Sequence, residues 1–466
     1  MPAFTNRKGA VTESALEARA YRKILWRLMP FLCVLYFAAN ADRAALAYAG
    51  PAGMNKELML SAATFGLVSA VFFIGYVLFE IPSSMMLQKF GSRRWLARII
   101  FTWGIIQALS AWAPNEFVLA ICRVLLGIAE AGFAPGVLFY LTLWLPAKKR
   151  AWAYGIFFAS AQSMTLFGGP LMSRLIQIGN EVLFLGLSGW RFMFLVTGVV
   201  PILLGIATLF VLSDSPAKAK WLSPDEKQVI VTDLAIEQSA IPAGEHSSIG
   251  QGLKNWRTWV LGIAYFTVPF AAYTTTFFMP TMVTNFNTQF ALTLDAVQVA
   301  WIVAIPALFA IAANLLTSRL VARSGKYGTW ALALTSIGAV GALVVTFSTS
   351  PIVMMAGLCL LAVSSATATP LFSIVPKLFA VAAVATAMAL VNSICSLGGF
   401  AGPYVTGSII SATGSDTLPF IVIAVLLVLG GLTMYLIDKY ADRLRETHAA
   451  TAADADTDPA APLASR

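Results

Sequence analysis

The sequence predicts an all-α membrane protein with twelve transmembrane helices arranged in two six-helix bundles. Of its 466 residues, 58% are hydrophobic and only 11% are charged, whereas soluble domains carry roughly 25% charged residues. Twelve apolar runs are each long enough to cross about 30 Å of hydrocarbon. Lys and Arg gather between alternate runs, which is typical of polytopic membrane proteins. The composition excludes soluble enzymes, disordered scaffolds and nucleic-acid-binding proteins.

The expected spans follow one another closely, with one long connection in the middle of the chain. Pro and Gly occur inside several spans, where neighbouring helices can satisfy the freed backbone groups. The expected spans are 28–48, 61–85, 95–113, 116–140, 151–175, 190–213, 257–284, 295–318, 328–348, 351–375, 380–408 and 417–437. The expected segments are an N-terminal segment 1–27, an N-terminal bundle 28–213, a central loop 214–256, a C-terminal bundle 257–437 and a largely disordered tail 438–466.

The basic residues predict the orientation in the membrane. Of the 31 Lys and Arg residues, 26 fall in the two terminal segments, the central loop or the other even-numbered loops. Positively charged loops stay on the cytoplasmic side. We therefore expect the protein in the inner membrane of a cell, with both termini in the cytoplasm. The net charge of +9 then reflects the orientation of the chain in the membrane.

A weak internal repeat supports the division into two halves. The second loop reads Lys89-Phe-Gly91 and the eighth reads Arg323-Ser-Gly325, and each is followed by a tryptophan. The two motifs lie about half a chain apart. Two parallel halves with a binding site between them near the middle of the membrane are a known transporter plan.

Four charges inside the predicted spans are the strongest functional candidates, because ionisable residues in a membrane cost several kcal/mol. Asp42 and Arg43 are adjacent in the first span. Arg123 and Glu130 lie seven residues apart in the fourth, so both project from nearly one face about 10 Å apart. Estimated depths favour an Asp42–Arg123 pair, whereas Glu130 reaches Arg43 only if the helices tilt or kink.

This set of charges suggests a mechanism. The four charges sum to zero, and protonating both acids leaves two guanidinium groups that seek an anion. Arg binds carboxylates through two parallel hydrogen bonds and stays charged. Protons would then favour anion binding, which is a physical basis for proton–anion symport. The alternative is that the four residues are structural ion pairs.

Other chemistry finds little support. No phosphate-binding G-x-x-x-x-G-K-[ST] motif is present. Both histidines, His246 and His448, fall in the central loop and the tail, and the four cysteines lie scattered in apolar stretches. We therefore predict no enzyme activity, no cofactor and no metal site.

Several segments resemble the major facilitator superfamily and, within it, the anion:cation symporter family, which includes carriers of tartrate, sugar acids, phthalate and 4-hydroxyphenylacetate. The matching segments include DRAALAYAG at 42–50, RVLLGIAEAGFAPGVLFYLTLWLP at 123–146 and ALVNSICSLGGFAGP at 389–403. The resemblance covers nearly the whole chain and implies the major facilitator fold. It is most specific in the first half.

The resemblance also implies roles for single residues. Asp42 and Glu130 match proton-linked acids, and Arg43 and Arg123 match arginines around the anion. Further positions expected at the substrate site are Tyr76, Gln162 and Asn392 by the resemblance, and Asn40 and Tyr273 by their places in the first and seventh spans. Asn40 stands where sugar-acid carriers tend to have tyrosine, which leaves the substrate open between hydroxy, sugar and aromatic acids.

The second loop resembles the superfamily's gating signature in reduced form. Its expected structural or gating residues are Gly91, Arg93 and Arg94, with Glu80 near the end of the second span as a partner of one arginine. The usual acid of this signature is absent.

The sequence therefore favours proton-coupled import of a small organic anion by a monomer that works in the lipid bilayer. An exporter or exchanger of the same fold is the alternative. An anion sensor without transport is less favoured, because the 43-residue central loop resembles a linker rather than a signalling domain.

Overall fold

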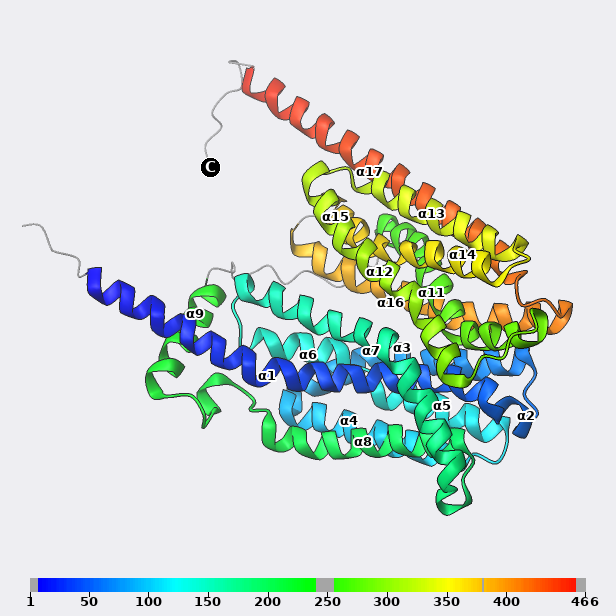
Figure 1. Ribbon diagram of the computed structural model, residues 1–466. Helices are drawn as coiled ribbons and strands as arrows, with labels where there is room; N and C mark the ends of the chain where they lie inside the picture. Colours follow the sequence, from blue (N-terminus) through cyan, green and yellow to red (C-terminus); the bar gives the residue numbers. More distant parts are fainter. Residues whose placement is uncertain (1–6, 240–254, 379–380, 458–466) are drawn as a thin grey trace, which may run out of the picture. The chain divides into compact units, whose positions relative to one another are not determined.

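The computed structural model describes residues 7–239, 255–378 and 381–457, and every regular element in these ranges is helical (Figure 1). Each of the twelve expected spans coincides with a helix or a pair of helices. Nine helical segments in the described ranges are long and apolar enough to cross a membrane. The other three expected spans overlap the helices α4 (Ser92–Ser110), α7 (Ala147–Val182) and α16 (Val381–Thr413), and α4 begins with a turn that contains two arginines.

By their contacts the helices fall into two compact units, residues 1–245, 273–308 and 399–416 in the first, and residues 246–272, 309–398 and 417–466 in the second. Wholly in the first unit are α1 (Arg7–Ala49), α2 (Asn55–Glu57), α3 (Ala62–Phe90), α4 (Ser92–Ser110), α5 (Glu116–Glu130), α6 (Phe133–Thr142), α7 (Ala147–Val182), α8 (Gly189–Val211) and α9 (Pro224–Ser239). Wholly in the second unit are α13 (Tyr327–Phe347), α14 (Pro351–Val363), α15 (Ala368–Leu378) and α17 (Pro419–Thr457). Both units share α11 (Trp256–Gln289), α12 (Ala296–Ser324) and α16 (Val381–Thr413).

The fourth and tenth spans are each interrupted near their middle. In the fourth, α5 ends at Glu130 and α6 begins at Phe133, and Gly132 between them has a φ of 82°. In the tenth, a 3₁₀ turn at Ser364–Thr367 separates α14 from α15. Interrupted membrane helices leave backbone groups free to line binding sites. The first interruption places Glu130 at a helix end.

Helical structure extends beyond the expected spans at both ends of the chain. The helix α1 begins at Arg7, well before the expected span, and α17 continues as far as Thr457. The extension of α17 is rich in alanine, which has the highest helix propensity. The tail expected to be largely disordered is thus helical over this stretch, and residues 458–466 lie outside the described range.

Part of the expected central loop is a helix that packs on α1. The helix α9 lies beside the N-terminal half of α1 (Figure 1). Its start is a capping box, because the Ser223 backbone N–H donates to the Glu226 carboxylate and the Glu226 N–H donates to the Ser223 hydroxyl. Lys23 of α1 donates to the same carboxylate at 3.0 Å. Burial alone would raise the pKa of Glu226, but the Ser223 N–H and the Lys23 ammonium hold that pKa below its ordinary value.

Each half of the sequence repeat contains the same acid-capped helix start. In the first, the Arg93 backbone N–H at the start of α4 donates to Asp214 at 3.1 Å. In the second, the Gly328 N–H at the start of α13 donates to the buried Asp438 at 2.7 Å. A carboxylate at a helix N-terminus satisfies free backbone donors and the helix dipole. The structure thus supports the repeat suggested by the Gly91 and Gly325 motifs.

Small residues bring helices of the first unit into backbone contact. A Cβ on Gly66 of α3 would lie 2.3 Å from the Pro403 carbonyl oxygen of α16, and one on Gly407 would lie 2.2 Å from the Ala62 oxygen. Close approach through glycines is a common form of helix packing in membranes. This contact explains why residues 399–416 belong with the N-terminal helices.

Candidate functional site

The four charges predicted from the sequence lie together in the first unit, on α1 and α5. Arg43 Nη2 lies 2.6 Å from Glu130 Oε1, which is a charge-assisted hydrogen bond. The Glu130 side chain is 1% exposed and that of Arg43 is 19% exposed. A buried pair of this kind is sensitive to the loss of either partner, which typically costs about 3–5 kcal/mol. Arg43 and Glu130 are therefore a buried ion pair in which each member needs the other.

The directions of the side chains explain why Glu130 reaches Arg43. Cα–Cβ bonds in a helix tilt toward its own N-terminus. The first and fourth spans cross the membrane in opposite directions, so Arg43 and Glu130 lean toward each other along the axis. By the same argument Asp42 and Arg123, whose depths nearly coincide, lean apart. Depths estimated from residue counts alone favoured the Asp42–Arg123 pair, whereas the hydrogen-bonded pair is Arg43–Glu130.

Asp42 and Arg123 keep most of their polar atoms outside hydrogen bonds. Both residues are buried, and neither Asp42 oxygen has a hydrogen-bond partner among the described residues. The same holds for Nε and Nη2 of Arg123. Burying an ionisable group without a partner is costly. A site that keeps such groups is suited to bind something charged.

An aromatic side chain lies against both arginines. The guanidinium carbon is 5.2 Å from the centre of the Phe72 ring for Arg43 and 5.1 Å for Arg123. Arg43 also lies 5.0 Å from the ring of Tyr76, one turn along α3. These are cation–π distances. The predicted Tyr76 thus contacts the site, and Phe72 was missed by the sequence reasoning although it lies four residues earlier on the same helix face.

Two glycines fix the position of this aromatic face. A Cβ on Gly75 of α3 would lie 2.4 Å from the Val124 oxygen of α5, and one on Gly127 would lie 2.0 Å from the Phe72 oxygen. The backbones of α3 and α5 therefore touch. This contact holds Phe72 against Arg123 and near Arg43.

We expect Gly127→Ala to destabilise the protein by about 1–3 kcal/mol, because an added methyl group meets backbone that cannot move alone. The measurement is the thermal unfolding midpoint in detergent. Gly136→Ala is the matched control, since its Cβ would meet only the ends of the Leu87 and Leu96 side chains. Equal midpoints for the two variants would show that the α3–α5 contact does not set the packing.

Asn40 lies one turn before Arg43 on α1 and is half-buried. Its amide nitrogen donates to the Tyr36 carbonyl oxygen at 2.7 Å, and the Tyr36 ring stacks on Phe157 of α7 at 4.2 Å. The short amide therefore occupies little space beside two aromatic rings. A larger residue here would change the shape of the space next to Arg43.

Accordingly, Asn40→Tyr is expected to narrow the space beside Arg43 and so to change the order in which ligands of different shape are preferred. The test is competition by a panel of hydroxy, sugar and aromatic acids against one labelled substrate. Asn40→Ala serves as the control, because it removes the amide and adds no bulk. An unchanged order for Asn40→Tyr over the whole panel would contradict a role in specificity.

Three further residues were predicted at the substrate site, and the structure describes the side chains of two of them. Tyr273 of α11 packs edge-on against Phe73, which neighbours Phe72, at 4.6 Å. Asn392 lies on α16 within the second unit and is exposed, and its backbone oxygen accepts from Cys395. Gln162 belongs to α7, but its side chain lies outside the described residues.

The predicted gating residues come together with an acid that the sequence reasoning missed. Arg93 Nε lies 3.8 Å from Asp214, in addition to the backbone bond. Gly91 has a φ of 85°, and a Cβ there would lie 3.2 Å from Asp214. Arg94 is exposed, and the expected contact of Glu80 with either arginine is not formed among the described residues. Asp214 was overlooked because it follows the sixth span, 121 residues beyond Arg93.

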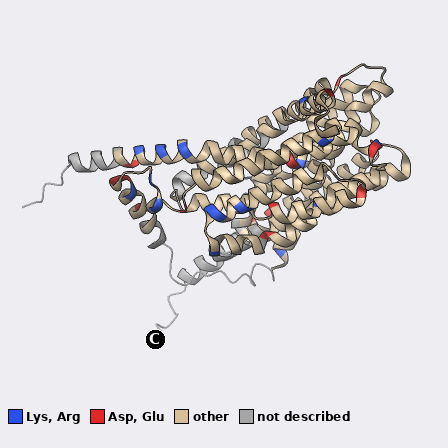
Figure 2. Cartoon of the chain, turned by 90° about the horizontal axis from the view of Figure 1, so that it is seen from below, with Lys and Arg blue, Asp and Glu red and all other residues tan. Residues whose placement is uncertain are grey.

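Charged side chains are sparse along most of the described helices and gather on the N-terminal part of α1 and on α9 (Figure 2). Within the described ranges, no group of three or more His, Cys, Asp or Glu side chains is placed to hold a metal ion. The site is therefore built from two acids, two arginines and an aromatic face.

Fold and site define a polytopic helical membrane protein with charges enclosed among its spans. The chain belongs to the Major Facilitator Superfamily, whose family model matches residues 32–294 and 261–464. Its members are transporters and not enzymes, so this chain is a secondary transporter. The expected family resemblance and fold are confirmed.

Relatives of known name cover almost the full chain. It is 37% identical over 429 residues to a protein of Agrobacterium vitis named "Putative tartrate transporter", covering 92% of this chain and 96% of that protein. It is 31% identical to a protein of Acinetobacter baumannii named "Quinolone resistance transporter", covering 90% of this chain and 95% of that protein. It is 30% identical to the inner membrane transport protein RhmT of Escherichia coli, covering 91% of this chain and 96% of that protein.

Solved structures show the same fold at lower identity. An inward-facing, occupied bacterial homologue of the human lysosomal transporter Spinster matches with a TM-score of 0.69 at 17% identity, covering 90% of this chain and 97% of that one. The nucleoside transporter NupG matches with a TM-score of 0.65 at 14% identity, covering 89% and 99%. These likenesses concern the fold alone.

Proposed function

We propose that this secondary transporter imports a small organic anion together with protons. The observation that carries the proposal is the arrangement of the four buried charges. Arg43 is held by Glu130, while both Asp42 oxygens and Arg123 Nε and Nη2 are buried without a hydrogen-bond partner among the described residues. A substrate carboxylate is the group that would satisfy Arg123, and it competes with Glu130 for Arg43.

Protons enter this scheme through the acids. Protonated Glu130 no longer neutralises Arg43, so a proton and the anion bind together more favourably than either binds alone. Alternating access would then carry both across the membrane. Tartrate-like hydroxy acids, sugar acids, dicarboxylates and aromatic acids are the candidate substrates. Similarity to the relative named "Putative tartrate transporter" supports testing the first class first.

The deciding experiment is uptake by purified protein in liposomes. Labelled acids of each class are offered at equal internal and external pH and with an alkaline interior. We expect one class to accumulate above the external concentration only with the pH gradient. Accumulation of none of these acids would contradict import of an organic anion.

Export or exchange is the second candidate, supported by the similarity to a transporter named for quinolone resistance. Reversing the imposed gradient discriminates the two. An exporter that exchanges protons for substrate concentrates its substrate in vesicles with an acidic interior, whereas a symporter does so with an alkaline interior.

We further propose that both termini face the cytoplasm of an inner membrane and that the protein acts as a monomer. The distribution of Lys and Arg supports the orientation, and the four charges supplied by a single chain support the monomer. Single cysteines introduced at positions 56 and 246 test the orientation. Labelling of position 246 from outside intact cells would contradict the proposed orientation. A measurement of the particle mass in detergent tests whether the protein is a monomer.

A further inference from the structure

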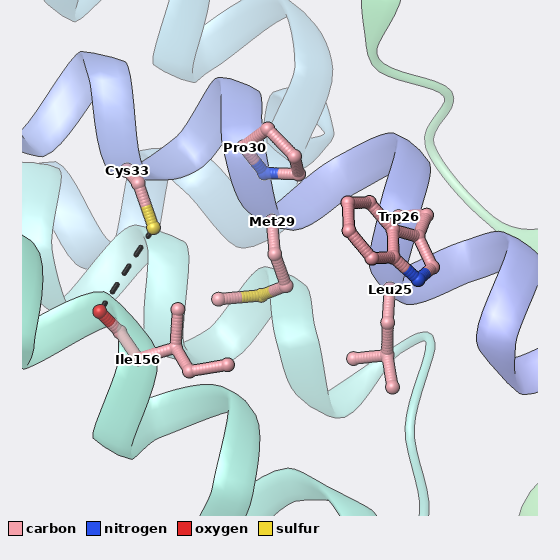
Figure 3. A pocket seen from close by; sticks show the side chains of 6 residues that line it. All are labelled: Leu25, Trp26, Met29, Pro30, Cys33 and Ile156. Carbon is pink, nitrogen blue, oxygen red and sulfur yellow. Dashed lines mark hydrogen bonds between the residues drawn. The ribbon is translucent and has the colours of Figure 1, made fainter.

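An apolar groove lies on the surface of the first unit between α1 and α7 (Figure 3). Its volume is about 210 Å³. The lining side chains carry no charge and are Leu25, Trp26, Met29, Pro30, Cys33 and Ile156. Trp26 is 76% exposed, so the groove opens to the surroundings of this unit.

A proline shapes one wall of the groove. Pro30 lies inside α1 and has no N–H, so the helical hydrogen bond to the Trp26 carbonyl is missing. At the end of the groove opposite Trp26, Cys33 Sγ turns toward the Ile156 carbonyl oxygen of α7 at 3.9 Å (Figure 3). The groove between the two helices is therefore apolar along its length.

Basic side chains continue this helix face beyond the groove. At about 100° per residue, Leu25, Met29 and Cys33 all lie within about 60° of Arg22 around α1. Arg19 lies one turn further toward the N-terminus, on the same side. Both arginines are exposed. The apolar groove thus ends beside two positively charged side chains, Arg22 and Arg19.

The other basic residues of this stretch face elsewhere. Lys23 bonds to Glu226 and Arg27 lies 5.2 Å from the ring of Trp221, so both contact the segment that contains α9. Around the helix they lie about 100° and 140° from Arg22. Arg22 is therefore separate from the residues that hold α9, whereas Arg19 also lies near enough to Glu226 to help lower the pKa of that carboxyl group.

We propose that this groove binds an anionic phospholipid, with one acyl chain in the groove and the phosphate at Arg22 and Arg19. An amphiphile with a negative head and an apolar tail matches both parts of the surface. Anionic lipids attract basic residues beside a membrane span with about 1 kcal/mol per Lys or Arg. A tryptophan at the junction suits the boundary between head groups and hydrocarbon.

The test is a titration of purified protein in detergent with phosphatidylglycerol, followed by native mass spectrometry. We expect one tightly retained lipid, and about fivefold weaker retention for Arg22→Gln, which corresponds to about 1 kcal/mol. Cys33→Phe, which fills the groove, should also weaken retention. Phosphatidylcholine, with the same chains and no net charge, should bind much more weakly.

Lys439→Gln is the matched control, because it removes an exposed basic residue of α17, a helix that does not line the groove. Equal loss for Lys439→Gln and Arg22→Gln would overturn the proposal, since binding would then follow net charge alone. Full retention in Cys33→Phe, or phosphatidylcholine binding as tightly as phosphatidylglycerol, would overturn it as well. None of these residues belongs to the charged site, so the outcome is independent of the transported substrate.

Discussion

Glu130→Gln should abolish accumulation driven by a pH gradient while leaving exchange of substrate across the membrane measurable. Glutamine is close to glutamate in shape, but it carries no charge at any working pH. Arg43 would then stay without its carboxylate partner, so the anion could bind without a proton. The loaded carrier still crosses the membrane, whereas the empty carrier with its unbalanced arginines does not return readily.

Two measurements in proteoliposomes distinguish the loss of proton-driven accumulation from a loss of substrate exchange. Uphill uptake with an alkaline interior should fall to the level of liposomes without protein, and counterflow of labelled substrate against unlabelled substrate should persist. Asp42→Asn should reduce coupling in the same direction and to a smaller extent. Glu116→Gln is the control, because Glu116 is exposed in the first turn of α5, far along the helix from Glu130. If Glu130→Gln and Asp42→Asn both concentrate substrate, the protons are carried elsewhere.

Arg123→Lys should weaken substrate binding by about 10- to 100-fold. Lysine keeps the positive charge but loses the planar fork that binds a carboxylate through two hydrogen bonds. A hydrogen bond to a charged group contributes about 1.5–3 kcal/mol, which gives this range. Calorimetric titration with the acid identified in the uptake panel measures the change.

Arg43→Lys should differ from Arg123→Lys in one respect. Both variants should lose affinity, but Arg43 also holds Glu130 at 2.6 Å. Its replacement should therefore shift the pH dependence of binding as well. Arg174→Lys is the control, since Arg174 is exposed and bonds to Gln177 on its own helix. Wild-type affinity in both site variants would show that the arginines do not bind the anion.

The positions of the spans were predictable from the sequence because hydrophobic length decides them. Interruptions within spans were not. Hydropathy is continuous across Glu130–Phe133, and only the conformation of Gly132 reveals the end of α5. The helix α9 was also missed, although Ser223 and Glu226 form the pattern of a capping box. A short polar helix gives no hydrophobic signal.

For the site, the sequence supplied the charges but not their pairing. Intramembrane charges stand out against an apolar background, so Asp42, Arg43, Arg123 and Glu130 were found directly. Which acid meets which arginine depends on side-chain direction and on helix contacts made through Gly75 and Gly127. Phe72 gave no signal of its own, because phenylalanine is ordinary in a membrane helix.

The interruption after α5 limits how this sequence can change over evolutionary time. Gly132 needs its positive φ, and a Cβ there would lie 2.5 Å from the hydroxyl oxygen of Ser83, so no other residue fits without strain. Glu130, two residues earlier, provides the carboxylate that Arg43 requires. Leu125 on the same helix is exposed, so this position tolerates replacement by apolar residues of many shapes. Descendants of this protein can therefore diverge along the outer face of α5 while the junction at its end stays nearly fixed.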